Sequence, residues 1–277
     1  MNRILSLFLF LSLSLSAKAQ DCSVVLNHFL IVVDSVTYQS LLSSELVNSE
    51  LAFAHEKTLS NWKGLYVIGE DNYIEIFHPK SIYDDSIPVG FSWISQSSLK
   101  ANCLKNYKLP NNDFIEYDSD EIFDYLSLNT QDSSNLMTTH EMNKDQYESW
   151  TKKIYNDSLT FEAVDYNSIA ESDSSKNYLF KNVSGLEIIL NQRDSLSISQ
   201  YLQLIGYTLE ASKKSTLKFS NGTDFLTIKF SMDTRMATVN TIYFELRQST
   251  ASRTIYLGSS IINLNDKTGK WVINGNQ

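Results

Sequence analysis

The first strand-like stretch of the chain is apolar at nearly every position, and one histidine interrupts it. Within residues 26–33, strand alternation puts His28 on the same face as Leu30 and Val32. The opposite face is equally apolar, which indicates a strand that is covered on both sides. Ser35 then caps an amphipathic helix. We therefore expect His28 to lie in the middle of a buried strand.

A second strand-like stretch, residues 73–77, carries a carboxylate where the first carries an imidazole. Glu75 stands between Ile74 and Ile76 in an otherwise apolar strand. A buried glutamate is costly unless it is paired, hydrogen-bonded or bound to a metal. Because two strands of a curved sheet can bring His28 and Glu75 together, the pair predicts two ligands of a metal ion.

The same periodicities predict alternating strands and helices over the first 150 residues. We expect further strands at 63–69, 89–95, 114–117 and 135–142, and helices at 35–42, 44–57, 97–104 and 120–126. The turn residues 70–72 join strands 63–69 and 73–77 as a hairpin. On this interpretation His55 lies at a helix end and His78 lies on the surface.

A further unit begins at Leu179 and has the same order of elements. Its strand, 179–190, precedes a helix over 196–205 that ends on Gly206, where glycine is favoured. Strands are expected at 217–219, 225–230, 239–246, 255–257 and 271–273. The order β-α-β-β-β recurs with a period too long for a solenoid, which indicates a few paired modules.

The first nineteen residues have the pattern of a secretory signal peptide. A short basic start precedes an apolar stretch over 4–15 and the cleavage pattern Ala17-Lys18-Ala19. The apolar stretch is short for a membrane span, and no later stretch is long enough. We expect a secreted or periplasmic protein with a signal peptide (1–19), an N-terminal module pair (20–150), a linker or helical segment (151–178) and a C-terminal region (179–277).

The chain is acidic, with a formal net charge of -9 that becomes more negative if cleavage removes Arg3 and Lys18. No cluster of basic residues offsets this charge. Nucleic acid and anionic membrane surfaces are therefore not expected as partners.

The chain has two cysteines, Cys22 and Cys103. In an exported protein they can form a disulfide, and closing a loop of about 80 residues stabilises the fold by about 4–5 kcal/mol in the loop-entropy model. The alternative is two separate thiols.

Several of these stretches resemble a known superfamily. Asn27–Asp34 before a helix resembles the opening of a module of the vicinal oxygen chelate superfamily, which includes glyoxalase I, bleomycin-resistance proteins and extradiol dioxygenases. Residues 73–77 resemble the closing strand of that module, Gly90–Trp93 the first strand of a second module, and residues 140–141 its final strand. The resemblance implies an α+β fold. Repeated βαβββ modules would form curved, cup-like mixed sheets in two module pairs, and the C-terminal pair is degenerate.

The resemblance also implies a metal site. His28, Glu75 and Glu141 match the metal-ligand places of the superfamily, and such a set suits Zn, Mn, Fe(II) or Ni. Glu141 is also the expected catalytic residue, because a spare carboxylate can move a proton while the metal holds the oxygens of a substrate. His140 is the alternative to Glu141, since neighbouring strand residues point to opposite faces.

Two functions remain open. The second module has Phe91 or Ser92 where a second histidine or glutamine usually stands, so the ligand set is incomplete. The first hypothesis is a metal-dependent lyase, isomerase or oxygenase acting on a small oxygenated compound. The second is an exported protein that binds a small molecule in the same cup without a metal.

Aromatic side chains are expected around the site in either case. The expected lining residues are Tyr66, Tyr73, Phe77 and Trp93. Less specific interpretations stay open, because His28 could be a hydrogen-bonded core histidine and Glu75 could face solvent from an edge strand.

Overall fold

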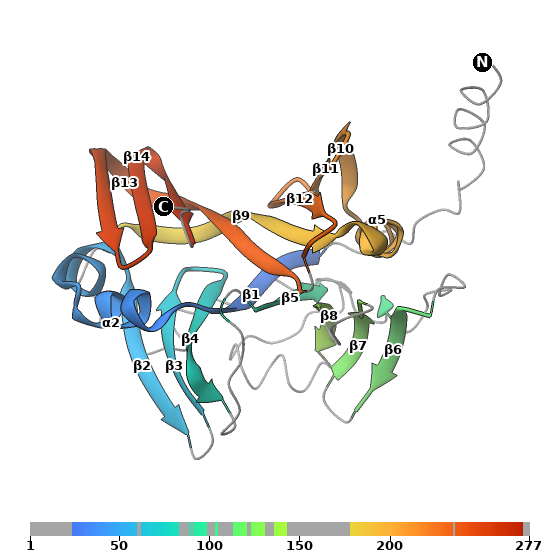
Figure 1. Cartoon of the computed structure of the whole chain (residues 1–277), viewed down its shortest axis with the longest axis horizontal. Helices are drawn as coiled ribbons and strands as arrows, with labels where there is room; N and C mark the ends of the chain where they lie inside the picture. Colours follow the sequence, from blue (N-terminus) through green and yellow to red (C-terminus); the bar gives the residue numbers. More distant parts are fainter. Residues whose placement is uncertain are drawn as a thin grey trace, which may run out of the picture.

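The computed structural model consists of two curved mixed sheets, one of eight strands and one of six, stacked on one another (Figure 1). It describes residues 24–59, 62–82, 89, 91–98, 103–104, 113–120, 123–130, 136–142, 178–234 and 236–273. The predicted signal peptide, 1–19, and residues 151–177 of the predicted linker lie outside the described residues. No helix among the described residues is long and apolar enough to cross a membrane.

The eight-stranded sheet has the order β2-β3-β4-β1-β5-β8-β7-β6. Its strands are β1 (Val24–Val32), β2 (Phe53–Leu59), β3 (Trp62–Ile68), β4 (Tyr73–Ile82), β5 (Ser92–Ser98), β6 (Ile115–Ser119), β7 (Phe123–Leu128) and β8 (Met137–Met142). Helix α2 (Ser35–Ser43) follows β1, and β1 pairs with β4 in parallel. Strands β5 and β8 are likewise parallel, and β1 and β5 pair in antiparallel fashion to join the two halves.

The six-stranded sheet repeats the topology of the first half. Its order is β10-β11-β12-β9-β13-β14, and β9 pairs with β12 in parallel. Its elements are β9 (Phe180–Asn191), α5 (Ser195–Leu204), β10 (Thr208–Lys213), β11 (Thr216–Ser220), β12 (Phe225–Ser231), β13 (Thr238–Leu257) and β14 (Ser260–Val272). The predicted fold of βαβββ modules in curved mixed sheets is therefore confirmed. The long hairpin of β13 and β14 stands where a fourth module would begin.

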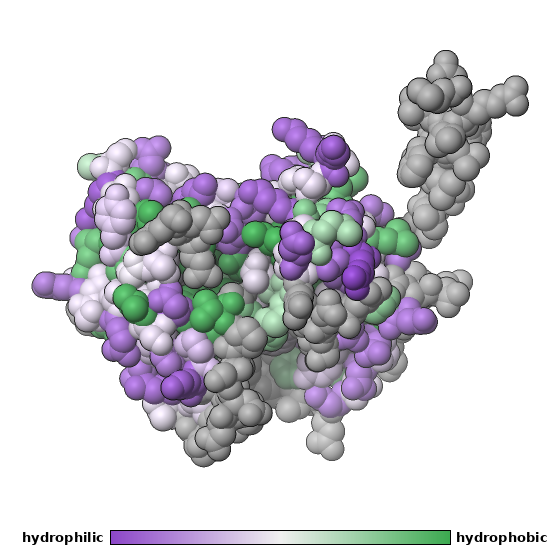
Figure 2. Space-filling view, viewed as in Figure 1, coloured by the Kyte–Doolittle hydropathy of each residue, from purple (hydrophilic) through white to green (hydrophobic). Residues whose placement is uncertain are grey.

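The hydrophobic core lies between the two sheets. Each sheet contributes the apolar residues of one face, all almost fully buried: Phe29, Ile31, Ile76 and Ile94 from the first, and Leu186, Ile188, Leu226 and Ile242 from the second. In the space-filling view, hydrophobic residues gather along the band where the sheets meet, and hydrophilic residues cover the outer ends of both sheets (Figure 2). Burial of this apolar area is the main force that holds the sheets together.

Two predicted helices, 44–57 and 120–126, are wrong because strand pairing outweighs local helix propensity, and residues 99–102 of the helix predicted over 97–104 lie outside the described residues. The stretch 44–57 forms a π-helical turn at Val47–Leu51 and then the edge strand β2. Its Ala, Glu and Lys residues favour a helix in isolation, but an edge strand also accepts charged side chains. The stretch 120–126 is mostly β7, and 97–98 still belongs to β5.

The tip of the β13–β14 hairpin docks on the first turn of α2. Asp34, rather than the predicted Ser35, caps this helix and accepts hydrogen bonds from the backbone N–H groups of Val36 and Thr37, both at 2.9 Å. The Ser259 hydroxyl donates to the same carboxylate, and the Ser259 N–H donates to the Thr37 hydroxyl at 3.1 Å. The hairpin thereby ties the second sheet to the first module.

Gly258 at the hairpin tip is expected to be essential for this docking. Its φ is +60°, and a Cβ there would lie 2.5 Å from the Thr37 backbone nitrogen. Gly222 is a matched control, since its φ is +90° but its surroundings are open. Gly258→Ala should lower the free energy of unfolding by about 2–4 kcal/mol, from backbone strain and overlap, against about 1 kcal/mol for Gly222→Ala. Equal losses in urea denaturation would contradict the docking.

Candidate functional site

One face of the eight-stranded sheet carries His28 on β1 and His140 on β8. Because paired residues point to the same side, His28 shares a face with its partners Tyr73 on β4 and Ser95 on β5. We call this the histidine face, in contrast to the face that packs on the second sheet. The same register places these further residues on it: His55, Tyr66, Glu75, Phe77, Trp93, Ser97, Tyr125, Thr138 and His140.

A β-bulge in β1 starts a chain of side-chain hydrogen bonds across this face. The register against β5 shifts between Leu26 and His28. Nδ1 of His28 lies 2.5 Å from the Asn27 side-chain oxygen, and the Asn27 amide donates to the Ser97 hydroxyl at 2.8 Å. That hydroxyl lies 2.8 Å from Nε2 of His140. Bulges often turn a side chain toward a functional site in this way.

The hydrogen-bond chain fixes which nitrogen of His28 carries its proton. Since the Asn27 amide group donates to Ser97, its oxygen is the acceptor for His28, so Nδ1 of His28 donates. Nε2 of His28 then keeps its lone pair, and it has no hydrogen-bond partner among the described residues. His28 therefore presents an acceptor to the histidine face.

Both histidines are held in the neutral form. Burial lowers the pKa of His28 to about 3, with a smaller contribution from His140, and burial lowers the pKa of His140 to about 4. Both rings are half-buried by surface area, but they lie among aromatic neighbours that displace water from the charged form. The ring of His140 is held at both nitrogens, by Ser95 at 3.1 Å and by Ser97.

Glu75 lies on the same face as these neutral histidines, on β4, the strand next to that of His28. It pairs with Leu30 on β1 and with Tyr66 on β3. Burial raises the pKa of Glu75 to about 7, while a hydrogen bond from Tyr73 and the charge of Lys57 act in the opposite direction. The interpretation of Glu75 as a solvent-facing edge carboxylate is therefore wrong, because β4 is an interior strand and the side chain is half-buried.

Aromatic rings form a continuous strip across the histidine face. Successive ring centroids are 5.3, 5.5, 6.0, 4.6 and 5.3 Å apart along the series Phe53, His55, Tyr66, Tyr73, His28 and Trp93. Each of these rings is half-buried. The strip crosses β2, β3, β4, β1 and β5, and it offers flat apolar surfaces beside the acceptors on His28 and Glu75.

The structure does not bring the three predicted metal ligands together. Glu141 lies on the opposite face from His140, and its carboxylate accepts the backbone N–H groups of Cys103 and Leu104 at 2.8 and 2.9 Å. Among the described residues, no group of three His, Cys, Asp or Glu side chains could hold a metal ion. His140, the alternative to Glu141, is on the correct face, but both of its nitrogens are hydrogen-bonded to serines. The described residues therefore do not fit a metal site of the expected kind.

The other predicted positions are distributed as follows. All four expected lining residues share the histidine face, although Phe77 is almost fully buried beside Gly64. His55 is not at a helix end but in β2, stacked on Tyr66. Cys103 is disulfide-bonded. Cys22 lies outside the described residues, so the pairing of these two cysteines stays a prediction.

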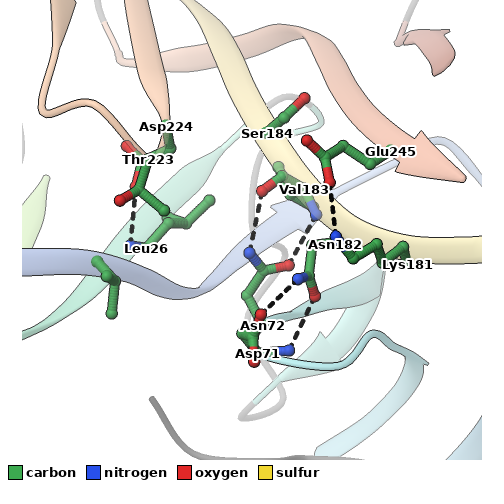
Figure 3. Close-up of a pocket in the computed structure, with 11 residues that line it drawn as sticks. Leu26, Asp71, Asn72, Lys181, Asn182, Val183, Ser184, Thr223, Asp224 and Glu245 are labelled. Atoms are coloured by element: carbon green, nitrogen blue, oxygen red, sulfur yellow. Dashed lines mark hydrogen bonds and ion pairs between the residues drawn. The ribbon is translucent and has the colours of Figure 1, made fainter. Parts of the chain in front are cut away.

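A separate pocket of about 180 Å³ lies at the junction of the two sheets (Figure 3). Lys181 and Glu245 form an ion pair of 3.1 Å on one side of it. On the other side, Asp224 accepts the Leu26 N–H at 3.1 Å and the hydroxyl of Tyr207. Burial raises the pKa of Asp224, and these hydrogen bonds oppose the rise. The hydrogen bond between Asp224 and Leu26 thus joins the two sheets, whereas the ion pair links β9 to β13 within the second sheet.

Comparison with known proteins identifies the family of this chain. A family model described as a family of unknown function, DUF5829, matches residues 26–273. The chain belongs to the DUF5829 family. No curated protein matches its sequence.

Solved structures with a similar fold are distant in sequence. A hypothetical protein from Staphylococcus aureus is 11% identical with a TM-score of 0.48, covering 86% of this chain and 97% of the other. A Mn(II)-bound glyoxalase from Novosphingobium aromaticivorans is 6% identical, with a TM-score of 0.44 and coverages of 88% and 79%. Homoprotocatechuate 2,3-dioxygenase from Brevibacterium fuscum is 8% identical, with a TM-score of 0.39 and coverages of 77% and 62%.

Sequence reasoning missed the residues that orient His28. Alternation along β8 does not tell whether His140 or Glu141 faces the site. The neighbours Leu136 and Met137 are both buried, so they do not identify the inner face by themselves. The bulge at Asn27 has no sequence signal, because every residue around it is compatible with a regular strand. Ser95 and Ser97 could have been found only from the register of β5 against β1 and β8.

Acid should destabilise the protein through the two histidines. Their pKa values are lower in the folded chain than in the unfolded one, so the unfolded chain binds more protons between about pH 4 and 6.5. This contribution to stability is present above pH 6.5 and is lost as the pH falls. The slope is at most about 1.4 kcal/mol per pH unit for each histidine, reduced by partial exposure.

The double variant His28→Gln, His140→Gln should therefore lose stability less steeply between pH 7 and pH 5 than the unmodified protein. Urea denaturation at each pH measures this slope. The raised pKa of Glu75 contributes with the opposite sign from about pH 4.5 to 7 and is common to both proteins. Trp93→Phe, which removes a neighbouring ring but no titrating group, should keep the original slope. An unchanged slope in the double variant would contradict the neutral histidine pair.

Proposed function

We propose that this protein binds a small organic molecule on the histidine face, outside the cytoplasm and after removal of residues 1–19. The observation that carries the proposal is the aromatic strip, with a free acceptor nitrogen and a carboxylate among its rings. Flat rings supply apolar contact area at low entropic cost, and a few placed polar groups give orientation.

The polar groups of the histidine face are oriented to accept hydrogen bonds from a ligand. Nε2 of His28 keeps a lone pair because Asn27 holds the proton on Nδ1. Orienting a histidine before binding lowers the entropic cost of the complex. Asn27 itself is almost fully buried, so this support does not depend on the ligand.

A metal-dependent reaction is the second candidate. It is favoured by one observation, the free Nε2 of a neutral His28 whose Nδ1–H is held by an amide oxygen, which is how metal-binding histidines are commonly oriented. Glu75 is the second donor on the same face. Against it, Glu141 is on the other face and His140 is held by two serines.

Ligand binding should depend on the ring of Tyr73. A screen of small aromatic and heterocyclic compounds by ligand-observed NMR should give hits that Tyr73→Leu weakens about tenfold, from loss of stacking worth about 1 kcal/mol or more. Tyr256→Leu is the matched control, because Tyr256 is 75% exposed on the β13–β14 hairpin. Hits that survive Tyr73→Leu and are lost in Tyr256→Leu would contradict the proposed site.

Metal analysis separates the two candidates. The metal-free candidate predicts little metal binding through His28 and Glu75. Protein purified without chelator and soaked with Zn, Mn or Fe(II) should bind much less than one metal ion per chain through these two side chains. A near-stoichiometric metal that is lost in the His28→Ala, Glu75→Ala double variant would favour the metal-dependent candidate over the metal-free one.

A further inference from the structure

The charges on the histidine face are unusual for a site that would take an acidic metabolite. The chain has no arginine between residues 4 and 192, so none lies on the eight-stranded sheet. His28 and His140 are neutral. Among the described residues of this face, the one cation is Lys57, which is exposed on the edge strand β2.

Acceptors and acids dominate the same face. Nε2 of His28 is an acceptor, and Glu75 offers a half-buried carboxylate among the rings of Tyr66 and Tyr73. The register of β6 against β7 adds two exposed acidic side chains at the far edge, Glu116 and Asp118. Among the described residues of this face, an anionic ligand would meet repulsion and find no buried cation.

A cation would find two kinds of partner in one place. The faces of aromatic rings attract an ammonium ion, most strongly where water is partly excluded, and a carboxylate nearby adds a direct ion pair. Burial costs the Glu75 carboxylate part of its hydration, and the hydrogen bond from Tyr73 and the charge of the exposed Lys57 offset only part of that cost. An incoming ammonium group would bring a positive charge directly to the carboxylate, and its N–H groups would reach the acceptors.

We propose that the ligand of the histidine face is an organic cation, an ammonium group on an apolar or aromatic body, held by the Glu75 carboxylate and the rings of Tyr66 and Tyr73. This proposal rests on the proposed function and specifies its ligand class. In this complex the apolar body would extend along the aromatic strip toward Trp93. His28 would accept a hydrogen bond from the ligand through Nε2.

Three probes of equal size and different charge test this proposal: 2-phenylethylammonium, 2-phenylethanol and phenylacetate, titrated by NMR at pH 8 and low salt. The ammonium probe should bind about tenfold more tightly than the alcohol, and phenylacetate should bind most weakly. Glu75→Gln should remove the advantage of the ammonium probe without changing the affinity for the alcohol. Glu116→Gln, which alters an exposed acid at the edge of the same face, is the control and should leave that advantage in place.

Each other outcome has a definite meaning. Equal or tighter binding of the alcohol or of phenylacetate overturns the assignment of a cation, and so does an ammonium affinity that Glu75→Gln leaves unchanged. If that binding is still weakened by Tyr73→Leu, the proposed function stands without the cation. Absence of binding by the ammonium probe also overturns the cation proposal, while the wider compound screen decides separately whether the face binds any molecule.

Discussion

The hydrogen-bond chain from His28 through Asn27 and Ser97 to His140 is the constraint on which the candidate site depends. It crosses the junction between the two modules of the eight-stranded sheet, where β1 and β5 pair in antiparallel fashion. Because each member satisfies the next, Nδ1 of His28 and both nitrogens of His140 are hydrogen-bonded although these rings lie among aromatic side chains. The same chain leaves one nitrogen of His28 free, and this is the atom that gives the face its chemistry.

The second sheet acts as the support for this arrangement. Its module packs on the opposite face of the first sheet, where Tyr201 and Gln96 hydrogen-bond to Thr139. The β13–β14 hairpin also holds the start of α2. One face of the first sheet packs on the second sheet, so the proposal places the ligand on the histidine face. The carboxylate of Glu141 is part of the core side, where it holds a turn that contains Cys103.

Sequence patterns predicted the parts of this structure that local periodicity controls. The strands β1, β3, β4 and β8, the module order and the common face of His28 and Glu75 all follow from alternation. The edge strand β2 and the strand β7 are predicted as helices from their sequences, because their polar residues suit either state and only pairing decides. Strand register decides that His140, and not Glu141, lies on the histidine face. The hydrogen bonds of Asn27 and Ser97 depend on register and on a bulge, and no local sequence pattern contains either. These are contacts between residues 43 to 70 positions apart.

The most direct test of the account is the protonation of His28, observed through the ring ¹⁵N signals of the labelled protein. We expect Nδ1 to carry the proton and Nε2 to be unprotonated, with both signals unchanged from pH 8 to pH 5. Asn27→Ala should change the tautomer or mix the two forms. A proton on Nε2, or a titration of His28 near its ordinary pKa, would contradict the central claim that the hydrogen-bond chain presents a neutral acceptor to the ligand.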